Sequence, residues 1–378
     1  MDWKRWPAHY IRRSLRISDA QWRIEQPDTG RKPKSLDRMK RTASIQTGRT
    51  TLRRAASVCG LLLLALLMII LAASVIGSQR LPLTASLCAL VGAPDCGLSS
   101  EQHAILFDIR LPRIFLAGLV GTCLATAGAG YQALLRNPLA EPYLLGVSNG
   151  AAVGTMTALV FFGAHEWSRP VFAFAGALVA SFVVYQLARG RAGATPERLI
   201  LAGVIVTTFL SSAIVFITTL MDATRIRSFT FWLLGDLSGT TSSLLMVTFG
   251  AAIAGVMVLG LNARSLNLMM LGERDAFDLG VEVSQVRLTV FVAASLLVGA
   301  SVASSGSVGY VGLVVPHLVR LSFGSDNRMV IIASALAGAT FVIVADTVAR
   351  TIIAPRELPV GAITALIGAP LFIYLLRR

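Results

Sequence analysis

Three arginines near the ends of apolar segments have the chemistry to bind carboxylates. Arg110 and Arg113 flank Pro112 at the start of one apolar run, and Arg350 follows Asp346 by four residues near the end of another. A guanidinium presents a rigid, planar set of donors that matches a carboxylate. Two interpretations stand side by side: a basic patch that binds an acidic partner, or anchors at a membrane edge with Asp346–Arg350 as a local pair.

The sequence offers little chemistry for catalysis, for nucleotide binding or for a metal centre. The four histidines and four cysteines form no cluster with ligand spacing, so we expect no metal site and no cofactor. The phosphate-binding pattern G-x-x-x-x-G-K-[ST] does not occur, which argues against an ATPase within this chain. Cys88 and Cys96 lie in one predicted external loop, where a disulfide is chemically allowed but not required.

Polar and helix-breaking residues end the same apolar run that begins at Arg110 and Arg113. One polar side chain lies near the end of the run, a proline dipeptide breaks it, and a glycine-spaced helix restarts it. Irregular backbone at membrane depth is stable only where protein or water covers it. We therefore expect a translocation path beside this break. Its residues are Gln132, Asn137, Pro138, Gly146 and Asn149.

The composition places the chain in a membrane. Hydrophobic residues make up 54% of the 378 residues and charged residues 14%, against about 25% charged in soluble domains. We predict an all-α, polytopic helix bundle with about ten transmembrane helices over residues 55–378. The expected spans are 57–77, 112–135, 143–163, 170–188, 199–220, 242–262, 286–304, 308–321, 329–348 and 359–376.

The N-terminal segment 1–54 is strongly basic, with fifteen Lys/Arg against five Asp/Glu. We expect a disordered cytoplasmic tail attracted to anionic lipid, because basic segments stay on the cytoplasmic side. No folded basic module accompanies the charge, so nucleic acid is not an expected partner. Ten spans then place both termini in the cytoplasm of a multi-pass inner-membrane protein. Met39 is a plausible alternative start, so the translation of residues 1–38 stays open.

The longest internal loop, 264–285, mixes apolar and acidic residues at helical spacing, and glycines divide it. This pattern predicts two short amphipathic helices on the cytoplasmic face, with a shape suited to a groove on a partner protein.

Five sequence blocks in order resemble one known family. They read RLPR, QALLRNPLAEPYLLGVSNGA, LNLMMLGERDAFDLGV, GYVGLVVPHLVR and ELPVGAITALIGAPLFIYLL. They are similar to the FecCD-like permeases of type II ABC importers for iron-siderophores, haem and cobalamin. The resemblance runs from about residue 57 to the C-terminus, and it leaves the basic tail outside.

The resemblance implies partners and roles. It implies a ten-helix subunit in a homodimer or a pair of related subunits, with cytoplasmic ABC ATPases below and a periplasmic or lipid-anchored substrate-binding protein outside. Arg110, Arg113 and Arg350 would receive carboxylates of the binding protein. The helix break and the fifth span would line the path. The segment 194–197 matches the family's cytoplasmic gate poorly and stays unassigned. ATPase coupling would fall to Leu268, Leu271, Gly272, Glu273, Ala276, Leu279 and Gly280.

These observations predict a non-catalytic permease of an ATP-driven metal-chelate importer. Iron(III)-siderophore is the first expectation for the cargo, cobalamin the second and haem the third, because the sequence of the permease does not fix the chelate. Two alternatives from other classes are an ATP-independent secondary transporter and a membrane-embedded enzyme. Both are disfavoured, because Asp346 is the single candidate acid within the expected spans and no polar catalytic cluster is found.

Overall fold

The computed structural model describes residues 52–77, 79, 81–92, 96–162, 167–190 and 193–376. Nearly all of the basic tail 1–54 lies outside these residues, so its predicted disorder stays a prediction. The membrane unit begins at Thr50. Its elements are α2 (Leu52–Val75), α3 (Leu83–Leu90), α4 (Ser100–Ala104), η1 (Ile105–Arg110), α5 (Leu111–Leu134), η2 (Pro142–Leu145), α6 (Val147–Phe161), α7 (Ser168–Ala188), β1 (Arg189–Gly190), β2 (Gly193–Ala194), α8 (Pro196–Thr218), α9 (Ala223–Leu233), α10 (Ser242–Leu261), α11 (Ala263–Met269), α12 (Glu273–Asp278), α13 (Val283–Ser305), α14 (Val311–Phe323), α15 (Asn327–Thr351) and α16 (Val360–Leu376).

The predicted all-helical bundle is confirmed. Seven helical segments of the described chain are long and apolar enough to cross a membrane, and α6, α14 and α16 are shorter apolar helices. Each corresponds to one of the ten expected spans. The departures from a pure helix bundle are small: a two-residue hairpin, β1 with β2, joins α7 to α8.

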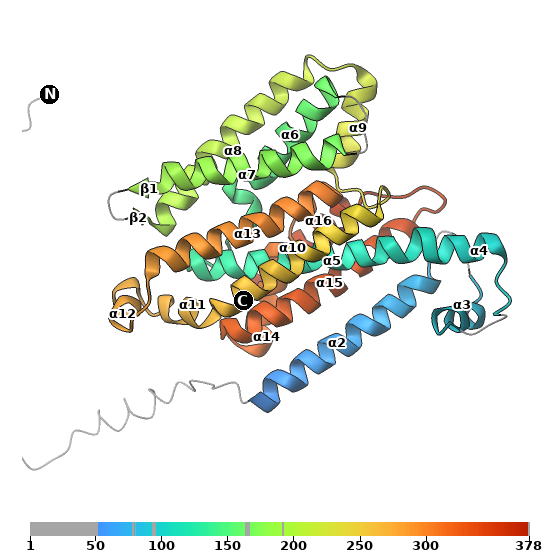
Figure 1. Cartoon of the computed structure of the whole chain (residues 1–378), viewed down its shortest axis with the longest axis horizontal. Coiled ribbons are helices and arrows are strands. Elements are labelled where there is room, and N and C mark those ends of the chain that lie inside the picture. The colour runs from blue at the N-terminus through green and yellow to red at the C-terminus, as the bar shows by residue number, and fades with distance from the viewer. Residues whose placement is uncertain are drawn as a thin grey trace, which may run out of the picture. The chain divides into compact units, whose positions relative to one another are not determined.

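Helix α5 forms the centre of the bundle, packed against α10, α13, α14 and α15 (Figure 1). Small residues allow this close packing. A Cβ added at Gly121 would collide with the backbone of Gly338 on α15, and one at Gly128 would collide with Gly312 on α14. Close backbone contact of this kind is how membrane helices associate without a hydrophobic driving force between them.

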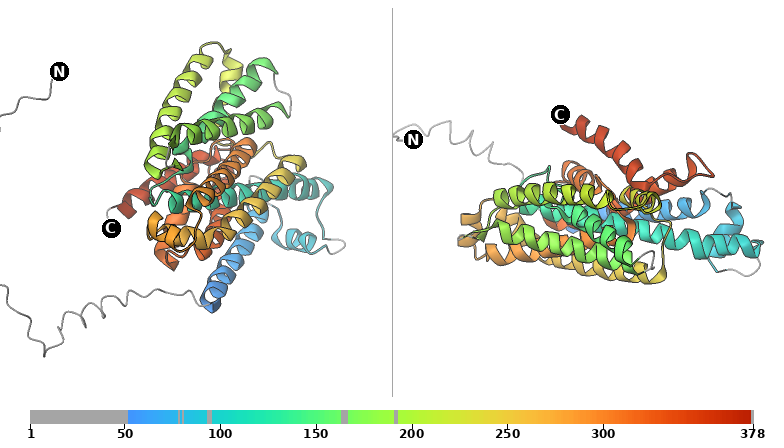
Figure 2. Two further views of the ribbon diagram at one scale, coloured as in Figure 1. Left: turned by 60° about the vertical axis from the view of Figure 1, so that its left-hand side comes forward. Right: turned by 90° about the horizontal axis from the view of Figure 1, so that it is seen from above.

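Helices α6, α7 and α8 form a second group beside α13, and α2 runs along the opposite side, next to α15 (Figure 1). Gly150 and Gly154 of α6 lie directly against the backbone of α7, so the predicted glycine spacing is a packing surface. Helix α16 projects from the layer formed by the other helices (Figure 2). Its side chains Leu366 and Ile373 are 71% and 56% exposed, so this chain alone leaves them uncovered.

The break between α5 and α6 has the form that its sequence predicts. Arg136 has a positive φ of 49°, which bends the chain away from the helix. The Asn137 side chain accepts a hydrogen bond from the Leu139 amide at 2.9 Å and closes a turn around Pro138. The short helix η2 follows, and Gly146, with φ 77°, leads into α6.

Candidate functional site

The predicted external arginines lie together at the start of α5 and the end of α15, and all three are buried. Arg110 has three hydrogen bonds to backbone carbonyls: Nη1 donates to Ser74 and Val75 at 2.8 and 3.0 Å, and Nη2 donates to Gln79 at 2.8 Å. It therefore binds the last carbonyls of α2, where a cation is favourable. Gly77 leaves room for this guanidinium, because a Cβ there would lie 2.7 Å from the guanidinium carbon and the arginine would have to shift.

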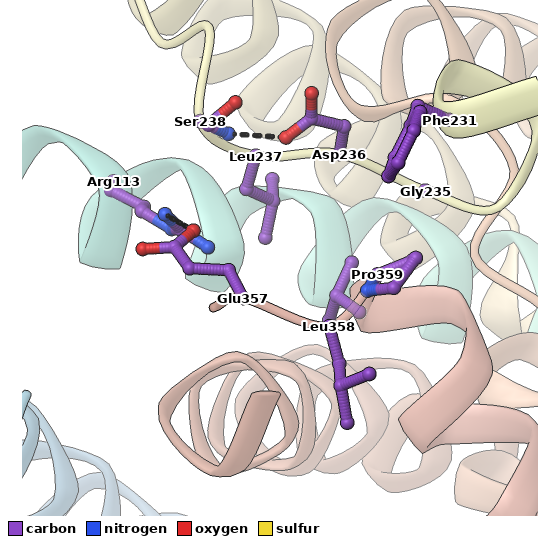
Figure 3. Close-up of a pocket in the computed structure, with 10 residues that line it drawn as sticks. Arg113, Phe231, Gly235, Asp236, Leu237, Ser238, Glu357, Leu358 and Pro359 are labelled. Carbon is purple, nitrogen blue, oxygen red and sulfur yellow. Dashed lines mark hydrogen bonds and ion pairs between the residues drawn. The ribbon is translucent and has the colours of Figure 1, made fainter. Parts of the chain in front are cut away.

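Arg113 lies between the carboxylates of Asp346 and Glu357, and Figure 3 shows it beside Glu357. Its Nε and Nη2 donate to Oδ1 of Asp346 at 3.0 and 2.9 Å, and its Nη1 donates to Oε2 of Glu357 at 2.7 Å. Arg350 Nε lies 2.9 Å from Asp346 Oδ2, as an ion pair that is not aligned as a hydrogen bond. The local Asp346–Arg350 pair considered from the sequence is therefore present, and it extends to Arg113 and Glu357.

We call Arg113, Asp346, Arg350 and Glu357 the external charge cluster, after their predicted side of the membrane, and they differ in exposure. Only the Glu357 side chain is open, at 39%, whereas the other three side chains are exposed by 9% or less. Arg113 and Glu357 line a cleft of about 160 Å³ together with Phe231 and Asp236 (Figure 3). Arg113 therefore reaches an opening, while Arg110 and Arg350 do not. Binding of a partner by these arginines stays a prediction.

The predicted cytoplasmic loop forms two short helices, α11 and α12, joined by residues 270–272. Four of its large side chains face outward: Met270, Leu271, Phe277 and Leu279 are 42%, 69%, 65% and 61% exposed. We name these four residues the apolar face. Leu268 is only partly buried, and Ala276 is fully buried. The predicted coupling residues therefore divide into an outward set around Leu271 and an inward set that supports it.

Side chains that sequence reasoning missed hold this loop in place. The Asn267 amide donates to Asp326 Oδ1 at 2.7 Å, and its carbonyl oxygen accepts from the Asn327 amide group and backbone N–H at 2.9 Å each. Glu273 Oε1 lies 2.8 Å from Arg136 and 2.6 Å from Arg287. The partners of Asn267 lie about 60 residues away in the sequence, and Arg136 lies 137 residues from Glu273. No local pattern therefore indicates these contacts.

Comparison with known proteins decides the family. The model of the FecCD transport family matches residues 62–378. The chain belongs to the FecCD transport family.

Curated relatives and a solved structure agree with this FecCD assignment. The haemin transport permease HmuU of Yersinia pestis is 42% identical over 72% of this chain and 83% of its own length. The cobalamin import permease BtuC of Halobacterium salinarum is 40% identical over 79% and 80%. A structure described as an inward-facing conformation of a candidate metal-chelate type ABC transporter aligns with a TM-score of 0.76 and 30% identity over 85% of this chain and 99% of that one.

The chain is thus a non-catalytic, multi-pass permease subunit of an ABC importer for metal chelates. Membership as an ABC transporter permease implies an ATPase and a substrate-binding protein as partners. Among the residues that the structure describes, no group of three or more His, Cys, Asp or Glu side chains is placed to hold a metal ion.

The predicted path residues lie around the break in this permease. Gln132 Nε2 donates to the Leu313 carbonyl of α14 at 3.0 Å, and its buried Oε1 has no partner among the described residues. Asn149 Nδ2 donates to the Thr207 carbonyl at 3.1 Å and to Ser211 Oγ at 2.8 Å, which joins α6 to α8. A Cβ on Gly146 would lie 3.3 Å from Val206, so its small size also allows α8 to approach.

Two residues of the break that we did not single out attach it to the loop before α14. The Tyr143 hydroxyl donates to the Val308 carbonyl and accepts from the Val308 amide, both at 2.9 Å. Glu141 Oε1 accepts from the Tyr310 amide at 3.1 Å. Burial raises the pKa of the Glu141 carboxyl above its ordinary value, and the Tyr310 hydrogen bond partly offsets this. Glu141 and Tyr143 therefore fix the break to the loop before α14.

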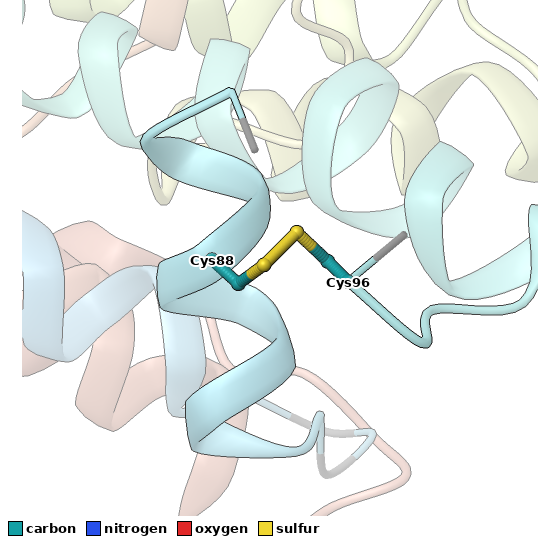
Figure 4. Close-up of a disulfide and its surroundings, with 2 residues drawn as sticks. All are labelled: Cys88 and Cys96. Carbon is teal, nitrogen blue, oxygen red and sulfur yellow. A yellow bond between two sulfur atoms is a disulfide. The ribbon is translucent and has the colours of Figure 1, made fainter. Parts of the chain in front are cut away.

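The disulfide that the sequence left open is present. Cys88 at the end of α3 is bonded to Cys96 before α4, with the Cα atoms 5.5 Å apart (Figure 4). The bond links the short helix α3 to the segment that leads into α4. Cys59 and Cys123 are free thiols.

Proposed function

We propose that this permease imports an iron(III)-siderophore type of chelate across the cytoplasmic membrane. It acts as a homodimer, with two ABC ATPases on its cytoplasmic face and a periplasmic or lipid-anchored binding protein outside. The proposal extends the assignment as a metal-chelate importer to a cargo, a subunit arrangement and an orientation. Iron-siderophore comes first because it is the commonest cargo of the family.

The observation that carries the proposal is the apolar face of α11 and α12. Four large apolar side chains on and beside α11 and α12 are 42–69% exposed, and α12 also bears Glu273, Asp275 and Asp278. A polar, acidic helix pair does not belong in the hydrocarbon core, so lipid tails do not cover this face. A contiguous exposed apolar patch marks an interaction site. We assign the ATPase to this surface.

The external charge cluster lies at the opposite end of α5 from this loop and supports the position of the binding protein. Arg113 already binds carboxylates in this chain, and it borders a cleft beside Phe231 and Asp236. A carboxylate of a docking protein would enter this cleft and take the place of the partly exposed Glu357. Rim charges of this kind set association rate and register more than affinity.

The exposed side of α8 supports a translocation path, and α16 supports a second subunit. Thr208, Ser211 and Ser212 are exposed on this helix, and Asn149 of α6 reaches it. Hydroxyl groups favour a water-lined path over a purely lipid-facing surface. The uncovered apolar side chains of α16 offer a surface for a second copy, which would pair with the first by two-fold symmetry.

Haemin and cobalamin are the alternative cargoes, because relatives that are 42% and 40% identical bear those names. An ATP-independent carrier is a weaker alternative. Asp346 is the one acidic residue among the buried side chains of the described chain, and two arginines lie against it. A carboxylate neutralised in this way is poorly placed to carry protons or sodium ions.

Uptake into proteoliposomes tests the proposal. The permease is reconstituted with its ATPase, and the binding protein is supplied outside with a radiolabelled ferric hydroxamate chelate, haemin or cyanocobalamin. We expect ATP-dependent accumulation of the ferric chelate and little accumulation of the other two. Accumulation of only haemin or cyanocobalamin would reassign the cargo. Uptake driven by an ion gradient without the ATPase would overturn the importer assignment.

A further inference from the structure

We propose that Glu273 transmits the movement of the ATPase-docking helix to the helix break and to α8, and that it does not itself bind the ATPase. The inference rests on the proposed ATPase docking at α11 and α12. It concerns a different surface, since the Glu273 carboxylate contacts residues of the permease. The elements that it joins are α12, the end of α5 and the start of α13.

Glu273 is the first residue of α12 and follows Gly272, whose φ of 147° allows the chain to turn there. Its Oε1 contacts two guanidiniums at once, Arg136 at 2.8 Å and Arg287 at 2.6 Å. Leu271 and Leu279, on either side of it in the sequence, are exposed to 69% and 61%. The loop thus offers apolar side chains outward and one carboxylate inward.

The two arginines connect α12 to the helix break and to the start of α13. Arg136 directly precedes the Asn137-Pro138 break, and its positive φ marks the point where α5 ends. Arg287 lies in the first two turns of α13, and its side chain is only 4% exposed. Glu273 is the one acidic partner with which Arg287 forms an ion pair in the described structure. A buried cation resists losing the carboxylate with which it forms an ion pair, so Arg287 and Glu273 should move together.

A second carboxylate faces the same two arginines. Glu197, in the first turn of α8, lies within electrostatic reach of both Arg136 and Arg287, and Thr195 hydrogen-bonds to it. Helix α8 also receives the Asn149 side chain from α6. When α12 moves away from the bundle, Glu197 is the acid that remains near the arginines. Exchange of Arg136 and Arg287 between Glu273 and Glu197 gives the two discrete arrangements that long-range coupling requires.

Glu273→Gln tests this role, because it removes the charge and keeps the size. The matched control is Asp278→Asn, the same acid-to-amide change on the same helix at a residue without an ion pair in the described structure. Both are assayed in proteoliposomes with the ATPase and the binding protein, using whichever of haemin, cyanocobalamin or a ferric hydroxamate chelate the unmodified transporter accumulates. Three quantities are measured: ATPase co-purification, ATP hydrolysis, and chelate taken up.

We expect Glu273→Gln to keep ATPase association and hydrolysis while uptake per ATP hydrolysed falls about ten-fold, within the usual range of coupling between sites. Asp278→Asn should leave all three quantities unchanged. Arg136→Gln should lower uptake per ATP hydrolysed in the same way. Arg136→Lys keeps the positive charge and should retain most of the coupling. The double variant Glu273→Gln with Arg136→Gln should be no worse than either single change, because the two residues act through one pair.

Two results would overturn the proposal. Loss of ATPase co-purification with Glu273→Gln would make Glu273 part of the docking surface, and uptake per ATP equal to that of Asp278→Asn would remove its role altogether. If Glu273→Gln fails to accumulate in the membrane, Arg136→Gln gives the same test from a side chain that is 36% exposed. A failure of ATPase docking itself would appear separately, as normal co-purification with Leu271→Asp.

Discussion

Asp346 is the residue on which the external charge cluster depends. It accepts from Arg113 and lies against Arg350, and its side chain is 1% exposed. Neutralising Asp346 leaves the buried Arg350 without its ion-pair partner and Arg113 with Glu357 alone, and breaking a buried ion pair costs about 3–5 kcal/mol. We therefore expect Asp346→Asn to lower the thermal unfolding midpoint in detergent or nanodiscs strongly. Glu357→Gln is the control, and its side chain is 39% exposed, so the change should be small. Equal midpoints for the two variants would contradict this account.

Glu357→Gln carries a second residue-scale prediction. Because Glu357 occupies Nη1 of Arg113 at 2.7 Å, it competes with any carboxylate that a binding protein brings to the cleft. Neutralising it should strengthen binding-protein docking several-fold, most clearly at low salt, where screening is weakest. Titration of the binding protein on nanodisc-embedded permease at low and high salt measures this. Weaker docking at both salt concentrations would mean that Glu357 belongs to the docking surface.

Because Arg113 lies against two carboxylates, Glu357 is a better position than Arg113 for testing this cluster. Reversing Arg113 to a glutamate would place three carboxylates together at Asp346 and Glu357 and would disturb folding. Changes at Glu357 leave the buried arginines intact.

Spacing in the sequence indicates partners that are close along one helix, but not partners that are distant in the chain. The Asp346–Arg350 pair is visible because four residues separate its members on one helix. The Arg113–Glu357 pair spans 244 residues and the Arg136–Glu273 pair 137, so neither follows from spacing. Asn267 carries no signal at all, since a lone asparagine in a loop has many uses. Folding, and not local pattern, brings these groups together.

At the element scale, the apolar face of α11 and α12 gives the clearest prediction. A charge at Leu271 or Leu279 would be buried without a partner on docking, which is costly. We expect Leu271→Asp and Leu279→Asp to abolish ATPase co-purification and uptake while the permease still accumulates in the membrane. Arg274→Gln is the control, because it changes a charge on the same helix outside the apolar face. Normal co-purification with both positions charged would place the ATPase elsewhere.

Close helix contacts allow a second element-scale prediction. A methyl group at Gly128 would overlap the Gly312 backbone of α14, whereas one at Gly250 of α10 meets nothing within 4 Å. Overpacking of this kind costs about 1–3 kcal/mol. We expect Gly128→Ala to lower the unfolding midpoint and Gly250→Ala to leave it unchanged or slightly higher. Equal midpoints would mean that α5 and α14 pack less tightly than described.

The helices themselves follow from the sequence to a large extent. Hydropathy indicates the spans because lipid requires about 20 apolar residues with all backbone hydrogen bonds made internally. Proline and glycine mark the break between α5 and α6, and the two glycines of the loop mark the ends of α12. The short helices α3 and α4 and the hairpin β1–β2 were not expected, because they are short and depend on surrounding contacts. The Cys88–Cys96 pairing was open for the same reason.

At the scale of the whole molecule, the remaining prediction is orientation. The basic tail precedes α2, and positive charge of this amount resists translocation. Ten spans follow it, so the C-terminus should return to the cytoplasm, and the loop that holds Cys88 and Cys96 should lie outside. A disulfide persists on the oxidising side of the membrane, which agrees with this placement.

Reporter fusions after residue 378 and within residues 90–105 test this orientation. We expect cytoplasmic reporter activity from the first and external activity from the second, and in intact spheroplasts a membrane-impermeant maleimide should label Cys88 and Cys96 only after reduction. A cytoplasmic signal from residues 90–105 would reverse the orientation and place the apolar face of α11 and α12 outside the cell, where no ATPase can bind it.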